Sequence, residues 1–142
     1  VVRKPHRRID EHLRHIGQLH AELVEELQGM IPEPLRRVFL LTTGSEATEC
    51  CIKLARTQGL TKGGKAKSVL VTFHNAFHGR TMGAQLAGGG TGLKGWLGDL
   101  DPRFVQVPFP DGFRQTDTGF HVFEKTLADL GVNPDAIEPS TL

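Results

Sequence analysis

The 142-residue sequence lacks several features that define whole classes of protein. Its two cysteines, Cys50 and Cys51, are adjacent, so they are poorly placed for a disulfide and too few for a metal cluster. Seventeen basic against sixteen acidic residues leave a net charge of +1, which argues against a nucleic-acid-binding stripe and an acidic tail. No apolar run reaches the ~18 residues that a membrane span needs. We therefore expect neither nucleic acid nor a membrane as partner.

The first residues also lack an initiator methionine and the apolar core of a signal peptide. Together with the adjacent cysteines, this favours a reducing, cytoplasmic location. The sequence has no internal repeat. Its 17 glycines concentrate in turns between apolar runs, which suggests an α/β protein whose loops approach a ligand closely.

Hydrophobic periodicity predicts an alternation of helices and strands. Amphipathic helical patterns, with apolar residues three or four positions apart, cover residues 7–28, 45–57, 81–87 and 120–130. Short β-prone runs typical of buried strands cover 38–43, 68–73 and 104–108. Polar or glycine-bearing loops are expected at 58–67, 74–80 and 88–102. Strands separated by helices predict an α/β fold with a mostly parallel sheet and flanking helices.

The alternation stops after the last helix. Residues 133–142 contain no further strand pattern, and three strands make a thin sheet with exposed edges. We therefore expect residues 1–142 to form a single partial domain, incomplete at both ends.

Two glycine-rich stretches match the sequence patterns of nucleotide-binding motifs but not the structural context that these motifs require. The stretch 59–66 reads G-x-x-x-x-G-K, but Ala66 replaces the metal-binding hydroxyl, and the stretch precedes a strand instead of following one. The stretch 90–95 reads G-x-G-x-x-G, but no strand comes before it. Both are interpreted as ordinary loops.

The segment Thr42–Glu49 is more informative. A predicted strand turns through Gly44 into a predicted helix, so free N–H groups at the helix start would face the strand's carboxyl end. Such groups, with the positive end of the helix dipole and the Ser45 hydroxyl, form an anion site. The alternative is plain capping of the helix, by Thr43 or Ser45 together with Glu46 or Glu49. The segment alone leaves both open.

A second cluster, Phe73–Thr81, also follows a predicted strand, at the sheet edge where α/β proteins bind ligands. Its aromatic, imidazole and guanidinium groups could stack on, hydrogen-bond and clamp a carboxylate-bearing ligand. The alternative is a loop with a core phenylalanine and a surface arginine.

The remaining histidines and cysteines give little indication of a functional site. His12, His15 and His20 place at most two ligands on one helix face, so no metal site is expected. The two cysteines are expected to be buried in a helix.

Three stretches, in matching order and separation, together resemble one family. They are Pro32–Phe39, Thr43–Arg56 and Ala76–Thr81. Over about 7–135 the sequence resembles the class III, pyridoxal-phosphate-dependent aminotransferases, which include the ornithine, 4-aminobutyrate and acetylornithine enzymes.

The resemblance implies a fold type I large domain that binds pyridoxal 5'-phosphate. Gly44 and Ser45 match the turn whose amides hold the cofactor phosphate, and Phe77 matches the aromatic residue that stacks on the pyridine ring, with His78 beside it. Arg80 matches an arginine that pairs with a substrate carboxylate in several members. The implied reaction transfers an amino group between an amino acid or ω-amino acid and a 2-oxo acid, in a homodimer.

The resemblance also implies what these residues do not supply. The family's Schiff-base lysine and the aspartate that faces the pyridine nitrogen lie downstream of the matched region, so no catalytic residue is assigned. We expect a fragment that is inactive alone. The alternatives are a non-catalytic phosphate-binding module, a truncated pseudo-enzyme, or another reaction on the same fold, such as that of an aminomutase, decarboxylase or racemase.

Overall fold

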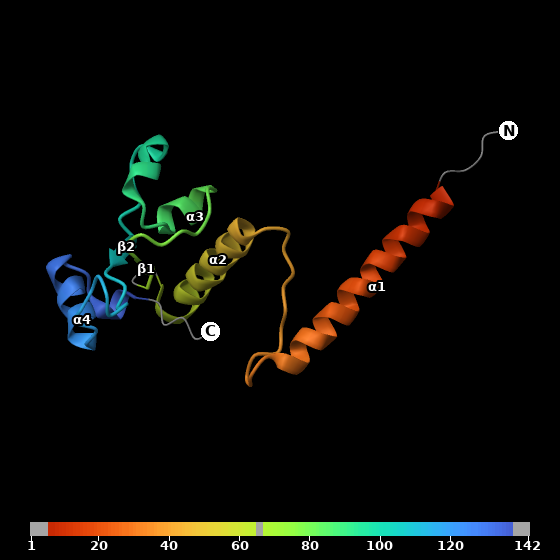
Figure 1. Ribbon diagram of the computed structural model, residues 1–142, viewed down its shortest axis with the longest axis horizontal. Helices are drawn as coiled ribbons and strands as arrows, with labels where there is room; N and C mark the ends of the chain where they lie inside the picture. The colour runs from red at the N-terminus through yellow and green to blue at the C-terminus, as the bar shows by residue number, and fades with distance from the viewer. Residues whose placement is uncertain (1–5, 65–66, 138–142) are drawn as a thin grey trace. The chain divides into compact units, whose positions relative to one another are not determined.

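The computed structural model describes residues 6–64 and 67–137, which belong to two compact units (Figure 1). The first unit extends to Leu40 and the second begins at Leu41. No helix in the described ranges is long and apolar enough to cross a membrane.

The first unit is built on helix α1 (His6–Met30), which confirms the helix predicted over 7–28. Gly29 lies inside the last turn, so the prediction that it ends the helix was wrong. Pro32 ends it instead, because a proline disfavours helical dihedrals at the residue before it. A turn follows, with a hydrogen bond of 3.0 Å from the Leu35 amide to the Pro32 carbonyl.

The strand predicted over 38–43 does not form. The segment has no regular structure before α2, and Phe39 is 74% exposed. A strand exists only where a neighbour supplies hydrogen bonds, and the two described strands pair with each other instead. The apolar run is therefore an irregular segment without hydrogen bonds to a neighbouring strand of the described ranges.

The second unit alternates helices with two strands (Figure 1). Its elements are α2 (Gly44–Gly63), β1 (Leu70–Phe73), α3 (Met82–Ala87), β2 (Phe104–Val107) and α4 (Phe120–Asp129). Short 3₁₀ turns lie at Thr91–Leu93, Gly95–Leu97 and Pro134–Ala136. The strands are parallel, with Leu70 opposite Phe104 and Phe73 opposite Val107, which confirms the predicted α/β arrangement.

Helix α2 is longer than the sequence predicted. It continues through the expected loop to Gly63 and ends at Gly64, whose φ is +62°. The Thr57 and Thr61 hydroxyls bond to carbonyls one turn earlier, and a single internal glycine costs a helix only about 1 kcal/mol. The stretch that resembles a phosphate loop is thus helical up to Gly63, while residues 65–66 lie outside the described ranges.

The sheet is covered on both faces. Val105 and Val107 are buried with Leu127 of α4, and Val71 and Phe123 pack against them. The alternate residues of the strands face the other helices: the Gln106 amide donates to the Gly88 carbonyl after α3, and Arg56 of α2 lies 4.9 Å from the Phe104 ring. Helix α2 is therefore held against the sheet through Arg56.

The chain returns to β1 at Ile137, which forms an isolated parallel bridge with Val69. The Val69 amide donates to the Ala136 carbonyl, whereas the next amide, that of Leu70, donates to Arg103 beside β2. Successive amides of a strand point to opposite edges, so Ile137 lies on the edge away from β2. This single bridge is not a strand, so it does not contradict the prediction that residues 133–142 contain no further strand; residues 138–142 lie outside the described ranges.

Candidate functional site

The start of α2 is capped by its own first residues. Thr43 is the N-cap, and its Oγ1 accepts a 3.2 Å hydrogen bond from the Glu46 amide. The Glu46 carboxylate accepts from the Thr42 amide at 3.0 Å and from the Thr42 hydroxyl. The hydrogen bonds from Thr42 hold the pKa of Glu46 below its usual value. Of the capping residues that the sequence left open, the structure therefore uses Thr43 and Glu46.

Capping leaves two amides at the helix start unused. The first intrahelical bond runs from Ala47 to the Thr43 carbonyl, and the amides of Gly44 and Ser45 donate to no acceptor among the described residues. Unpaired amides at the positive end of a 20-residue helix favour an anion. Capping and anion binding are thus compatible here, because they use different N–H groups.

The second cluster contacts this helix start at Gly79. A Cβ on Gly79 would lie 2.2 Å from the Ser45 Oγ and 3.1 Å from the Ser45 Cα, and Gly79 has a φ of +124°. Only glycine fits such an approach in that conformation. The two clusters, which sequence analysis could only place at the same edge, are therefore in direct contact.

Glu49 makes a second connection between these segments. Its Oε1 accepts hydrogen bonds from the Thr81 hydroxyl at 2.6 Å and from the amides of Gly83 and Ala84 at 2.8 and 3.1 Å. Burial raises its pKa, but the three hydrogen bonds outweigh burial, so that the pKa is lowered overall. Glu49 thus caps α3, not its own helix as one alternative proposed.

The ring and charged groups of the loop are accessible. Phe77 is 73% exposed, Arg80 is exposed, and His78 is half-buried. None of the three forms a hydrogen bond, ion pair or ring contact within the described part of the chain. Their groups are available to a ligand next to the Ser45–Gly79 contact.

A pocket of about 540 Å³ opens at the carboxyl ends of β1 and β2. Its walls include Phe73, His74, Asn75, Phe109, Asp111 and Arg114. Phe73 and Phe109 contact edge to face, with ring centroids 5.0 Å apart. The predicted cluster Phe73–Thr81 contributes its first residues to this pocket, whereas Gly44, Ser45, Phe77, His78 and Arg80 do not line it. The sequence analysis missed the part of the edge that follows β2.

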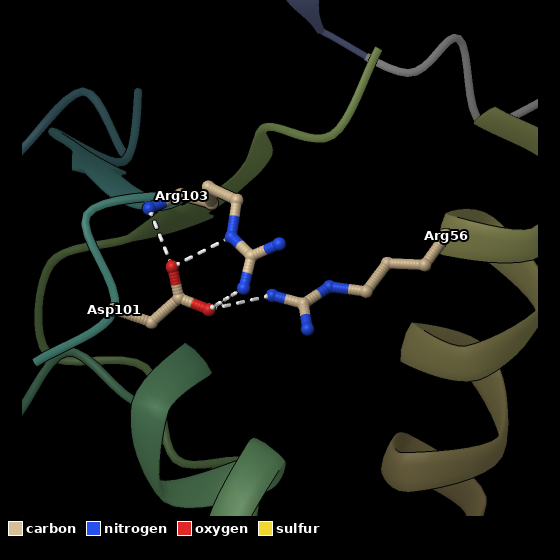
Figure 2. Close-up of polar contacts among 3 residues, drawn as sticks. All are labelled: Arg56, Asp101 and Arg103. Atoms are coloured by element: carbon tan, nitrogen blue, oxygen red, sulfur yellow. Dashed lines mark hydrogen bonds and ion pairs between the residues drawn. The ribbon is translucent and has the colours of Figure 1, made fainter. Parts of the chain in front are cut away.

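Asp101 connects the middle of α2 to the start of β2 (Figure 2). It accepts from Arg103 at 2.8 and 2.7 Å and from Arg56 at 3.0 Å. The hydrogen bonds from Arg103, joined by that from Arg56, hold the pKa of Asp101 well below its usual range although burial opposes them. The cluster ties the middle of α2 to the residues before β2.

Other side chains of the described ranges show no comparable arrangement. No three His, Cys, Asp or Glu side chains in these ranges are grouped as metal ligands. Cys50 is half-buried and Cys51 exposed, both as free thiols, which corrects the expectation that both are buried. Neighbouring helical residues point in different directions, so one face cannot bury both.

The family model described as "Aminotransferase class-III" matches residues 13–137. The chain belongs to the class III aminotransferases. Over 100 residues it is 38% identical to an acetylornithine aminotransferase of Bacillus cereus, covering 68% of this chain and 24% of that protein. It is also 38% identical over 88 residues to an adenosylmethionine-8-amino-7-oxononanoate aminotransferase of Aquifex aeolicus, covering 62% and 19%.

Solved structures agree with this assignment. A thermostable (S)-enantioselective omega-transaminase from Thermomicrobium roseum superposes with a TM-score of 0.70 at 25% identity, covering 83% of this chain and 28% of that one. A thermostable omega-transaminase variant engineered for asymmetric synthesis of enantiopure bulky amines gives 0.66 at 26% identity, covering 82% and 28%. The class III chain thus has the fold of these transaminases and spans about a quarter of their length.

The class III family implies pyridoxal phosphate, and the residues present fit its phosphate. The amides of Gly44 and Ser45 and the Ser45 hydroxyl provide donors, and Gly79, which has no Cβ, leaves room for the Ser45 side chain. The motif predicted these donors, whereas Gly83 and the Arg56–Asp101–Arg103 cluster were not predicted. Gly83 follows the loop motif by two residues, a spacing that could have indicated close contact; no sequence signal pairs Asp101 with Arg56.

Proposed function

We propose that this chain supplies the phosphate-binding and ring-facing part of a pyridoxal-phosphate-dependent aminotransferase. The enzyme would transfer an amino group between an amino acid or ω-amino acid and a 2-oxo acid. The contact of Gly79 with Ser45 is the observation that supports this best, because it joins a phosphate-type anion site to a loop with an aromatic ring and an arginine. The bound cofactor would act as the electron sink of the reaction.

Each residue has a role that follows from its position. The amides of Gly44 and Ser45 would donate to the phosphate, and the Ser45 hydroxyl would add a further donor. The exposed ring of Phe77 would stack on the pyridine ring, with His78 beside it. The exposed guanidinium of Arg80 would bind the substrate carboxylate through paired hydrogen bonds.

The rest of the site would come from other residues of a longer protein. We assign no residue of this chain as the lysine that binds the cofactor covalently, and we expect the chain alone to be inactive. A cytoplasmic homodimer is the assembly we propose for the whole enzyme.

A chimera tests the proposal. Residues 13–137 would replace the corresponding stretch of the Bacillus cereus acetylornithine aminotransferase. We expect the chimera to bind pyridoxal phosphate and transfer amino groups. Arg80→Ala in the chimera should raise the KM for a carboxylate substrate and leave cofactor binding intact, whereas Phe77→Ala should weaken cofactor binding.

A soluble chimera that binds no pyridoxal phosphate would contradict the proposal. A chimera that binds the cofactor but transfers no amino group, with both variants behaving like the parent, would favour the non-catalytic phosphate-binding module.

A further inference from the structure

The segment that follows β1 contacts α2 at two points. The two contacts are four residues apart both in the segment and in α2. Gly79 approaches Ser45, and a Cβ on Gly83 would lie 2.4 Å from the Glu49 Oε2 and 3.2 Å from the Ile52 Cδ1. Residues four apart on a helix share one face, so Ser45 and Glu49 form a continuous strip of α2. The segment 79–83 follows this strip in the same direction.

The two contacts differ in strength. At Ser45 the segment only packs, since no hydrogen bond joins Ser45 to Gly79. At Glu49 one carboxylate oxygen accepts three hydrogen bonds, and bonds to a charged acceptor are stronger than neutral ones. Among the described residues, Glu49 is therefore the point at which side-chain hydrogen bonds hold the segment on α2.

The charge of Glu49 alone would oppose a phosphate at the helix start. The carboxylate lies one helical turn from Ser45, close to the position of a dianion. A group that served only as a charge would thus weaken phosphate binding. The three hydrogen bonds give it another role.

We propose that Glu49 is a positioning residue that fixes the loop 77–80 against the phosphate-binding start of α2. The inference rests on the proposed function, since it concerns the same phosphate site. When Glu49 holds Thr81, Gly83 and Ala84, Gly79 remains on Ser45, and the loop's ring and guanidinium stay beside the bound cofactor. When it does not, the loop samples positions away from α2, and the binding-competent population falls.

The test titrates the 142-residue chain with inorganic phosphate and with pyridoxal phosphate, followed through the amide NMR signals of Gly44 and Ser45. We expect Glu49→Ala to raise the Kd for pyridoxal phosphate about three- to tenfold, in proportion to the lost competent population. Glu49→Gln, which keeps an acceptor oxygen and loses the charge, should restore part of the affinity. If the carboxylate acted only by charge repulsion, both variants would bind pyridoxal phosphate more tightly and the Kd would fall.

Asp101→Ala is the matched control. It also removes a carboxylate that ties α2 to another element, but its partner Arg56 lies about 16 Å along the helix from Ser45. We expect it to lower the thermal midpoint and leave the Kd unchanged. Amide exchange of Gly83 and Ala84 without ligand should accelerate in Glu49→Ala and not in Asp101→Ala.

The outcomes separate the inference from the proposed function. If the wild-type chain binds neither phosphate nor pyridoxal phosphate, and the chimera binds no pyridoxal phosphate either, the proposed function is overturned, and the inference with it. If only the chimera binds, the same variants are compared in the chimera. A wild-type chain that binds pyridoxal phosphate, with an equal or lower Kd in a folded Glu49→Ala, would overturn the positioning role alone.

Discussion

Helices α1 and α2 have similar lengths, 25 and 20 residues, but their sequences and surroundings are opposite. In α1, apolar residues recur at helical spacing, and yet Leu13 is 62% and Leu23 48% exposed. In α2, two charged side chains, Glu49 and Arg56, make the side-chain hydrogen bonds to later segments of the described chain. The apolar spacing in α1 indicates only which face of the helix would be buried against a partner. In α2, by contrast, two charged residues form the hydrogen bonds that hold the helix in the described structure.

The largest effect should come from filling the contact between α2 and its loop. Gly79→Val would place a branched side chain where even a Cβ lies 2.2 Å from the Ser45 Oγ, at a φ of +124°. Backbone strain and overpacking together should lower the free energy of unfolding by about 2–5 kcal/mol, measured by urea denaturation.

The control for this substitution lies in α1. A Cβ at Gly29 meets nothing within 4 Å, so Gly29→Ala should change stability by no more than about 1 kcal/mol, in the stabilising direction. Equal losses in the two variants would show that the contact of Gly79 with Ser45 is absent in solution.

An intermediate effect should follow from removing the charge of Asp101. Asp101→Asn weakens the hydrogen bonds from Arg103 and Arg56, and we expect a loss of about 1–3 kcal/mol at neutral pH. The lowered pKa of Asp101 adds a pH dependence. A carboxyl group whose pKa is lower when folded stabilises the fold above its unfolded pKa of about 3.9 and loses that contribution as the pH falls further.

Urea denaturation at pH 7 and at low pH checks this expectation. The difference in stability between wild type and Asp101→Asn should shrink as the pH falls below about 4. A difference that stays constant down to the lowest pH at which both fold would mean that the carboxylate is not held by the two arginines.

The smallest effect should come from the apolar stripe of α1. Leu23 is 48% exposed, so Leu23→Gln should change the free energy of unfolding by less than about 0.5 kcal/mol. Leu127→Ala, in the core under α4 where Leu127 is 1% exposed, should instead cost about 2–5 kcal/mol. A Leu23 variant as unstable as the Leu127 variant would show that α1 is covered in solution.

Local patterns predicted the elements that depend on short-range signals. The runs that contain β1 and β2 alternate with amphipathic helices, and this order was enough for a parallel sheet. The segment 38–43 has the same apolar character but no strand, because a strand depends on a partner that no local pattern specifies. The end of α2 was predicted at residue 57 but lies at Gly63, because glycine and threonine weaken a helix without ending it.

The sequence predicted the residues that could contact a ligand, but not the contacts that hold these residues in place. Gly44, Ser45, Phe77, His78 and Arg80 were named from motif and resemblance, and the structure joins their two segments through Gly79. Their individual roles toward a cofactor remain predictions. Glu49 was named only as a cap of its own helix, because a carboxylate in a sequence does not reveal which distant amides it will meet. The contacts of Asp101 with the two arginines, which hold the middle of α2, were missed for the same reason.

The bridge between Val69 and Ile137 determines how the chain winds. From β1 the chain passes over one face, through α3, to β2; from β2 it passes over the other face, through α4, to the far side of β1. The connections that leave β1 and β2 therefore run over opposite faces, and the winding reverses between these two strands. In open parallel sheets, such a reversal separates the two connecting loops and leaves a crevice above the strand ends. The loop that starts at His74 leaves β1 at this reversal, so the course of the chain, independently of any motif, places the crevice next to the loop that the sequence motifs predict as a ligand site.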